Sequence, residues 1–138
     1  MTTSAALAAV VTVVSGVSGI RRAPSNPTET ANAFPFAICY IQDGQADASP
    51  MGTRKHLFSI AVEVYTARKD LARDFAVIAP FVDTVPAALL AEVSAGGDQF
   101  SGTLATFEGV SYELIERNYA GVDVIGYKFV MNNVKIII

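Results

Sequence analysis

The stretch RKHLFSIAVEVYTA, residues 54–67, alternates between two sets of side chains with a period of two. This is the period of a β-strand, in which successive side chains point to opposite faces of the sheet. It is the strongest strand prediction in the chain. One set holds His56, Phe58, Ile60, Val62 and Val64, and the other holds Leu57, Ser59, Ala61, Glu63 and Tyr65.

Three further stretches predict strands. FPFAICYIQ has apolar residues on both sides, so we expect this strand to be covered twice, by a helix and by another layer. Two strands close the chain, at about residues 110–118 and 124–138, separated by YAGVD. Asn132 and Asn133 indicate a bend or bulge inside the last one, which is longer than a usual strand.

The first 22 residues could form a secretory signal peptide, a membrane anchor or the first helix of a soluble domain. No basic residue precedes the apolar run, and Arg21 and Arg22 follow it, so a signal peptide is disfavoured. Thr12, Ser15 and Gly16 interrupt the run, which disfavours a membrane span. Helical spacing of its apolar residues predicts an amphipathic helix over residues 4–18 that docks on a sheet, with Gly19 as its stop.

A second helical region follows the alternating strand. Its expected buried stripe is Leu71, Phe75, Ile78 and Val82. Pro80 must kink or divide this region. Thr84 would then cap a second short helix that has Pro86 in its first turn.

The elements therefore come in the order α-β-β-α-β-β. The connections between consecutive strands are too short for crossovers, which predicts antiparallel pairing. We expect a single α+β domain over residues 1–138, with a four-stranded, mainly antiparallel sheet and the helices packed on one face.

The composition is poor in charge. Charged residues make up 17% of the 138 residues, against about 25% in an average protein. This shortage indicates that a second copy or another protein covers part of the apolar surface. The net charge is −3 and no basic run occurs, which argues against sequence-independent nucleic-acid binding. The single cysteine, Cys39, cannot form an internal disulfide.

The residues that could carry chemistry form no recognisable constellation. One histidine, His56, and one cysteine give no metal-ligand cluster, and we expect His56 to pack beside Phe58. Asp43 and Asp47 lack the ligand spacing of a calcium loop. GGDQFSGT has Thr103 where a phosphate loop requires lysine. We therefore expect no catalytic residues, no cofactor and no metal, and the chain is not predicted to be an enzyme.

Two segments are candidates for contacts with partners. The polar stretch 43–52 is long for a hairpin loop, and long loops are often functional. Its expected contact residues are Asp43, Asp47 and Met51, with Arg54 and Lys55 at the start of the next strand. The terminal VKIII should extend a sheet, within the subunit or across to a neighbour, because an exposed apolar edge would aggregate. Its expected contact residues are Val134, Ile136 and Ile138.

Four segments of this sequence resemble the tail terminator proteins of long-tailed bacteriophages: SGVSGIRRAP, PFAICYIQDG, TRKHLFSIAVEVYTARKDL and GVSYELIERNYAGVDVIGYKFVMNNVKI. The shared elements are a leading helix that ends in Gly-Ile, a proline-led strand, and an arginine-led strand that closes with a Lys-Asp-Leu helix start. The resemblance covers nearly the full chain. Other neck proteins of the same phages, namely connector, stopper and tail completion proteins, have related folds and are the first alternative.

The resemblance implies a structural subunit of a homohexameric ring. Such a ring caps the head-proximal end of the tail tube, ends tube polymerisation and joins the tail to the head. The implied partners are the tail tube protein and the head-tail connector or stopper protein. DNA would pass through the ring lumen without sequence-specific binding. The implied location is the virion neck after assembly in the host bacterial cytoplasm, without a membrane.

A non-viral oligomeric binding module of ferredoxin-like appearance is the second alternative. A small-molecule pocket with convergent polar groups would favour that alternative, and the sequence shows no such cluster.

Overall fold

The computed structural model describes residues 2–24, 33–48, 54–93, 99–104, 106–119 and 121–137. The predicted order α-β-β-α-β-β is confirmed, with the second helical region divided between two helices and a further short helix, α4, in the connection that follows it. In chain order the elements are α1 (Thr3–Ser15), β1 (Phe36–Ala48), β2 (Arg54–Ala67), α2 (Leu71–Ile78), α3 (Phe81–Leu90), α4 (Gln99–Gly102), β3 (Gly109–Tyr119) and β4 (Val122–Ile137).

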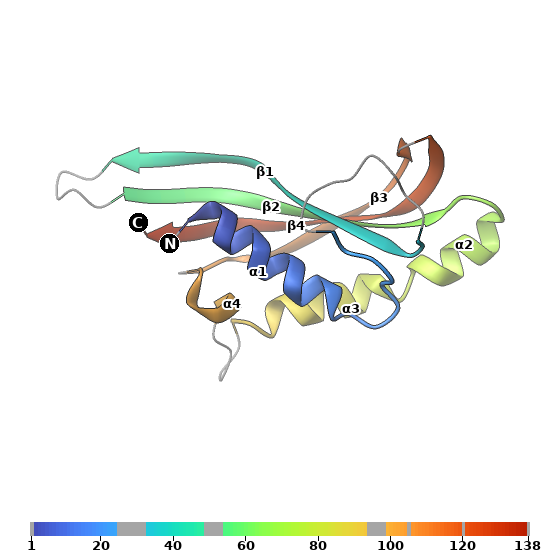
Figure 1. Cartoon of the computed structure of the whole chain (residues 1–138), viewed down its shortest axis with the longest axis horizontal. Coiled ribbons are helices and arrows are strands. Elements are labelled where there is room, and N and C mark those ends of the chain that lie inside the picture. The colour runs from blue at the N-terminus through green and yellow to red at the C-terminus, as the bar shows by residue number, and fades with distance from the viewer. Residues whose placement is uncertain are drawn as a thin grey trace.

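The four strands form one sheet in the order β1-β2-β4-β3, and every neighbouring pair is antiparallel. The alternating stretch forms β2, one of the two inner strands. All four helices lie on one face of the sheet (Figure 1). The predicted α+β fold is therefore confirmed. At one end the β1–β2 hairpin extends beyond the helix layer, and α2 lies at the opposite end (Figure 1).

The main core fills the space between the helices and the sheet. The predicted alternation of β2 is confirmed, because Phe58, Ile60, Val62 and Val64 all lie in this core. On β1, Ala37 and Cys39 face the same core.

The opposite face of the sheet carries a second, smaller apolar cluster. Phe36 and Ile38 of β1 are buried there with Tyr65 and Val124. Partly buried side chains from the segment before β1 and from the β3–β4 hairpin pack against them, among them Phe34 and Ile115. The expectation that β1 is covered on both faces is thus confirmed.

The first helix packs on the sheet as predicted. The Thr2 side chain accepts a hydrogen bond from the Ala5 N–H at 3.1 Å, which satisfies one free donor of the first turn. Val10 and Val14 are fully buried in the main core. α1 ends at Ser15 with Gly16 as its C-cap, which is earlier than the predicted stop at Gly19. No helix in the described part of the chain is both long and apolar enough to cross a membrane.

The expected buried stripe of the second helical region is only partly right. Pro80 separates α2 from α3, as predicted, and each helix then buries its own face. Ile78 is buried, but Leu71 and Phe75 are exposed and Val82 is only half-buried. After the break the helical phase is reset, so α3 buries Phe81, Val85 and Leu89 in place of Val82. Leu71 and Phe75 precede the break, and they are exposed on α2 at the end of the molecule (Figure 1).

The prediction for Thr84 is wrong. It lies inside α3, and its hydroxyl donates to the Pro80 carbonyl at 3.2 Å, so it caps no helix. Pro86 also lies in the interior of α3.

The bulge predicted in the last strand is confirmed. Met131 pairs with Ile60 and Val134 pairs with Phe58, so two residues of β4 lie opposite one residue of β2. Asn133 has a φ of 54°, a left-handed conformation that asparagine tolerates better than most residues. The extra residue reverses the alternation, so Met131 and Val134 both face the main core.

Candidate functional site

The predicted partner loop over residues 43–52 is wrong in its extent. β1 continues to Ala48, and Asp43 lies inside the strand with an exposed side chain. The pairing continues because β2 has strong strand character and supplies a ladder that overrides the turn-like composition of DGQADA. A bulge between Ile41 and Asp43 marks the point where this polar arm begins.

The structure places most of the predicted hairpin residues on one ladder. Asp47 lies directly opposite Lys55, and Ala48 lies opposite Arg54, near the end of the arm. Met51 lies outside the described residues. The arm therefore carries acidic and basic residues in adjacent register positions, as the sequence suggested, but on paired strands.

The predicted terminal contact residues belong to the core of this subunit. Val134 and Ile136 have no exposed surface, and they pair with Phe58 and His56 of β2. The terminal strand thus extends the sheet within the subunit. Because the bulge turns both side chains inward, they offer no surface to a neighbour, which corrects their assignment as contact residues. Ile138 lies outside the described residues.

The sheet has two edges of different character, and the start of β1 is bridged on its outer side by Arg22, whose carbonyl accepts the Ala37 N–H at 2.8 Å. β1 forms one edge and β3 forms the other. On β3, Tyr112 is 53% exposed and Leu114 is 46% exposed. Their register partners, Phe129 and Tyr127 of β4, pack in or against the main core, so apolar surface continues from the core to the edge. We call Tyr112 and Leu114 the β3 strip.

Helix α2 has two different flanks on either side of its buried face. Ile78 points into the core, and the pair Arg73 and Val77 lies on one flank, against a pocket. Leu71 and Phe75 lie about 200° around the helix from Arg73, on the other flank. Both are exposed, so α2 adds further apolar surface beside the sheet.

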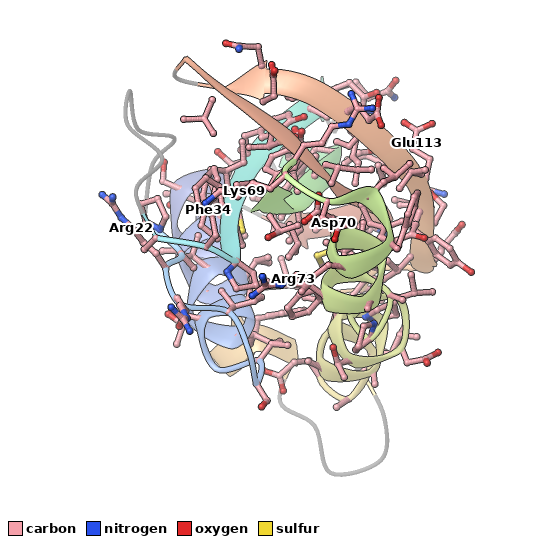
Figure 2. All side chains as sticks on the ribbon, turned by 90° about the vertical axis from the view of Figure 1, so that its right-hand side faces the viewer. Arg22, Phe34, Lys69, Asp70, Arg73 and Glu113 are labelled. Carbon is pink, nitrogen blue, oxygen red and sulfur yellow. The ribbon has the colours of Figure 1, made fainter. Side chains whose placement is uncertain are left out.

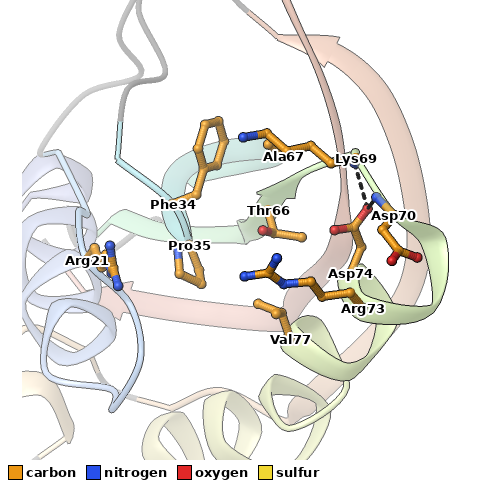
Figure 3. Close-up of a pocket in the computed structure, with 10 residues that line it drawn as sticks. All are labelled: Arg21, Phe34, Pro35, Thr66, Ala67, Lys69, Asp70, Arg73, Asp74 and Val77. Atoms are coloured by element: carbon orange, nitrogen blue, oxygen red, sulfur yellow. Dashed lines mark hydrogen bonds between the residues drawn. The ribbon is translucent and has the colours of Figure 1, made fainter.

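The pocket lies between α2 and the segment that leads into β1. It has a volume of about 420 Å³. Figure 3 shows the side chains of Lys69 and Arg73 reaching from the α2 side across the hollow toward Phe34 and Pro35. The lining residues are Arg21, Phe34, Pro35, Thr66, Ala67, Lys69, Asp70, Arg73, Asp74 and Val77. We call this the basic pocket.

Backbone hydrogen bonds hold both walls of the basic pocket. The Arg21 N–H donates to the Pro35 carbonyl at 2.8 Å. On the other wall, Oδ2 of the buried Asp74 accepts the N–H groups of Lys69 at 2.8 Å and Asp70 at 3.2 Å. The carboxylate thereby fixes the turn between β2 and α2. Figure 2 shows Lys69, Arg73 and Phe34 on the same side of α2, and Glu113 of β3 on the other.

Sequence reasoning missed the basic pocket. Arg21 comes from the segment after α1, Lys69 from the turn before α2, and Arg73 from the first turn of α2. The i, i+4 spacing of Lys69 and Arg73 was the one local signal, because it places both side chains on one flank of a helix. Their meeting with Arg21 and Phe34 depends on the tertiary fold.

A carboxylate is buried on the face of the sheet that the helices leave open. Glu63 of β2 has no exposed surface. Its Oε1 lies 2.9 Å from Nη1 of Arg117, and the Tyr40 hydroxyl donates to its Oε2. The contact with Arg117 is an ion pair without hydrogen-bond alignment. Burial, and then the bond to Glu63, raises the pKa of Tyr40 to about 12.

The two classical reactive side chains do not meet. His56 packs edge-on to Phe58, with 5.3 Å between ring centroids, as predicted. Cys39 pairs with Val62, so it lies six positions along β2 from His56, or about 20 Å at the usual strand rise. Burial raises the pKa of the Cys39 thiol to about 12, which keeps it protonated. Within the described ranges, no three His, Cys, Asp or Glu side chains are grouped to hold a metal ion.

Comparison with known proteins identifies no family. No protein-family model matches this chain, and no curated protein matches it significantly. The resemblance to tail terminator proteins therefore rests on the four sequence segments, and it stays a prediction. What the geometry adds is two unlike sheet edges, exposed apolar side chains at one of them, and the basic pocket.

Proposed function

We propose that this chain is a structural subunit that assembles with copies of itself into a closed ring, and that the ring is the tail terminator of a long-tailed bacteriophage. The observation that carries the proposal is the pair of unlike edges on opposite sides of one sheet. A ring needs two different, complementary surfaces on each subunit, because every copy contacts one neighbour with each.

The β3 edge supports this proposal most directly. Tyr112 and Leu114 are large apolar side chains on an edge strand, where unpaired backbone groups invite pairing with another chain. A neighbour that covers the β3 strip would remove this apolar surface from water. Burial of apolar surface stabilises an interface by about 25 cal/mol per Å² before the costs of association.

The projecting β1–β2 hairpin supports the second half of the proposal. It reaches beyond the helix layer at one end of the molecule (Figure 1). Asp43, Asp47, Arg54 and Lys55, together with Met51, form the segment that would contact an adjoining ring of tube or connector protein. The lumen of the ring would let DNA pass without sequence-specific contacts.

The test of ring formation uses two neighbouring residues of β3. Leu114→Asp places a charge in the β3 strip, and Glu113→Gln changes the adjacent, exposed residue as the control. We expect both variants to fold by circular dichroism. Only Leu114→Asp should lose the sixfold ring at the end of tail tubes in electron micrographs. Normal rings with Leu114→Asp would contradict the proposed interface.

The test of tail termination is deletion of the gene from the phage that carries it. Tail tubes of uncontrolled length and unjoined heads are expected. Tails of normal length, or a stable dimer of the purified protein with no place in the particle, would refute the assignment. Normal-length tails that fail to join heads would instead favour a connector, stopper or tail completion protein.

The basic pocket favours one other function, an oligomeric binding module outside any virion. The cationic side chains that line it are polar groups of the kind expected in the pocket of such a module. The two functions are separated by location, because a binding module would be found in the cell and not in purified particles. Mass spectrometry of purified virions decides between them.

A further inference from the structure

We propose that the basic pocket binds a small organic phosphate. The phosphate group lies among Arg21, Lys69 and Arg73, and the apolar or aromatic part of the ligand lies against Phe34 and Pro35. This site is separate from the β3 strip and from the β1–β2 hairpin. The proposal therefore stands whether or not the protein forms a ring.

The three cations line one pocket, and none of them has an ion-pair partner in the part of the chain that the structure describes. Among the described residues, the ion pairs join Arg68 to Glu116 and Arg117 to Glu63, and none involves Arg21, Lys69 or Arg73. Figure 3 shows Lys69 and Arg73 extended into the hollow instead of folded back on the helix. Like charges held near one another raise the free energy of the empty site, and a bound anion lowers it.

The carboxylates that share the pocket are on its α2 rim. Asp74 is buried, and its Oδ2 already accepts two backbone N–H groups. Asp70 and Asp74 lie on the far side of the Lys69 and Arg73 side chains from Phe34 (Figure 3). The space between the cations and Phe34 is therefore positive, and a metal ion would be repelled from it.

A phosphate group matches this arrangement better than a carboxylate does. A phosphate monoester carries a charge of about −1.5 to −2 and three acceptor oxygens at neutral pH. Two guanidinium groups and one ammonium supply fixed and adjustable donors for those oxygens. A carboxylate carries half the charge and would leave one of the three cations without an acceptor.

The volume and the apolar lining of the rest of the pocket favour an organic group attached to that phosphate. Its volume of about 420 Å³ lies in the usual range for organic ligands, roughly 300 to 1,000 Å³, and exceeds what an inorganic ion fills. The half-buried Phe34 ring and Pro35 offer apolar surface opposite the cations, and Val77 adds to it. A flat or apolar group would bury this surface while its phosphate stays among the charges.

The experiment is a titration of the folded, full-length chain with phenyl phosphate, followed by isothermal calorimetry and by amide chemical shifts. Inorganic phosphate and benzoate are the matched probes that lack the ring or the phosphate. We expect phenyl phosphate to bind more tightly than either, and to shift the amide signals of Thr66, Lys69 and Arg73. Arg73→Gln and Lys69→Gln should each weaken binding about tenfold, the loss expected for one charge-assisted hydrogen bond.

Arg68→Gln is the control, because Arg68 is an exposed arginine that pairs with Glu116 outside the pocket. It should bind phenyl phosphate like the unchanged protein. A dissociation constant of 1 mM corresponds to a binding free energy of −4.1 kcal/mol. If phenyl phosphate shows no binding at concentrations up to about 10 mM, the proposal is overturned. Equal losses with Arg68→Gln and Arg73→Gln, or equal binding of benzoate, would overturn the site or the phosphate assignment.

Discussion

Nη1 of Arg117 lies 2.9 Å from Oε1 of Glu63, although the Arg117 side chain is 40% exposed and Glu63 has no exposed surface. The edge strand β3 thus sends a cation inward to neutralise a charge on the inner strand β2. The Arg117 guanidinium also lies over the Tyr65 ring, 5.8 Å from its centroid. Both contacts join β3 to β2 on the face of the sheet that the helices do not cover.

Removal of Arg117 should cost more stability than removal of the charge on Glu63. Arg117→Met leaves a buried carboxylate without its cation, and we expect the free energy of unfolding to fall by about 2 kcal/mol. Glu63→Gln keeps an acceptor for the Tyr40 hydroxyl and removes the buried charge, so its loss should be smaller. Urea unfolding of both variants measures the difference.

The control for that pair is Arg68→Met. Arg68 pairs with Glu116 across 3.8 Å, and both side chains are about half exposed. Such surface ion pairs contribute about 0 to 1 kcal/mol. If Glu63→Gln proves more destabilising than Arg117→Met, the carboxylate is not the group that Arg117 neutralises.

Alkaline pH should weaken the fold through Cys39. Burial raises the pKa of its thiol from 9.0 to about 12 in the folded chain. Between these values the unfolded chain loses this proton and the folded chain keeps it, so the free energy of unfolding falls as pH rises above about 9. Below pH 9 the thiol is protonated in both states and has no effect on the pH dependence.

Cys39→Ala tests this linkage, because it removes the titrating thiol. Its free energy of unfolding should decline less steeply above pH 9 than that of the unchanged protein, by up to about 1.4 kcal/mol per pH unit. Urea unfolding at a series of pH values gives both curves. Parallel curves across this range would show that the thiol does not contribute.

Gly126 should not tolerate a side chain. A Cβ atom at this position of β4 would lie 1.7 Å from the Val64 carbonyl oxygen on β2. We expect Gly126→Ala to push the two inner strands apart and to cost about 3 kcal/mol or more. Thermal unfolding measures the loss. Gly109→Ala is the matched strand control, since a Cβ there meets nothing within 4 Å, and its melting temperature should barely change.

The tip of the β1–β2 hairpin should be dispensable for folding and required for assembly. Ala46 and His56 lie opposite each other, so residues 47–55 can be replaced by Asn-Gly, a two-residue turn that suits a hairpin. This change removes Asp47, Met51 and both basic residues of the tip. Circular dichroism should show an intact fold, and micrographs should show tails and heads apart. Normal yields of infectious particles would mean that the tip has no role in assembly.

Local pattern was enough to predict the sheet but not its extent. The alternation from His56 to Tyr65 identified a strand, because successive side chains of a strand point to opposite faces of the sheet. Asn132 and Asn133 revealed the bulge because few other residues accept a positive φ. By contrast, the composition of residues 43–48 resembles a loop, and pairing with β2 determines its strand conformation.

The candidate sites depend on contacts between distant parts of the sequence. Arg21 reaches the basic pocket only because its segment is hydrogen-bonded to the start of β1 at Pro35. The pattern placed Glu63 on one face of its strand but gave no sign of its burial, which follows from β1 and β3, the strands that bring Tyr40 and Arg117 to it. The residue spacing within a single segment cannot predict these contacts.

The bulge at Asn133 changes which residues of β4 face the main core. Odd-numbered residues such as Phe129 and Met131 face the main core before it, and even-numbered ones such as Val134 and Ile136 face the same core after it. The one extra residue at this point is therefore what lets both halves of a strand of this length face the same core. Regular pairing of the strand at its present length would turn Val134 and Ile136 to the opposite face, whereas loss of one of the two asparagines would remove the bulge and leave both facing the core in a regular ladder. An added residue that paired regularly with β2, with the bulge retained, would instead turn the final apolar side chains away from the core, although none of them had changed.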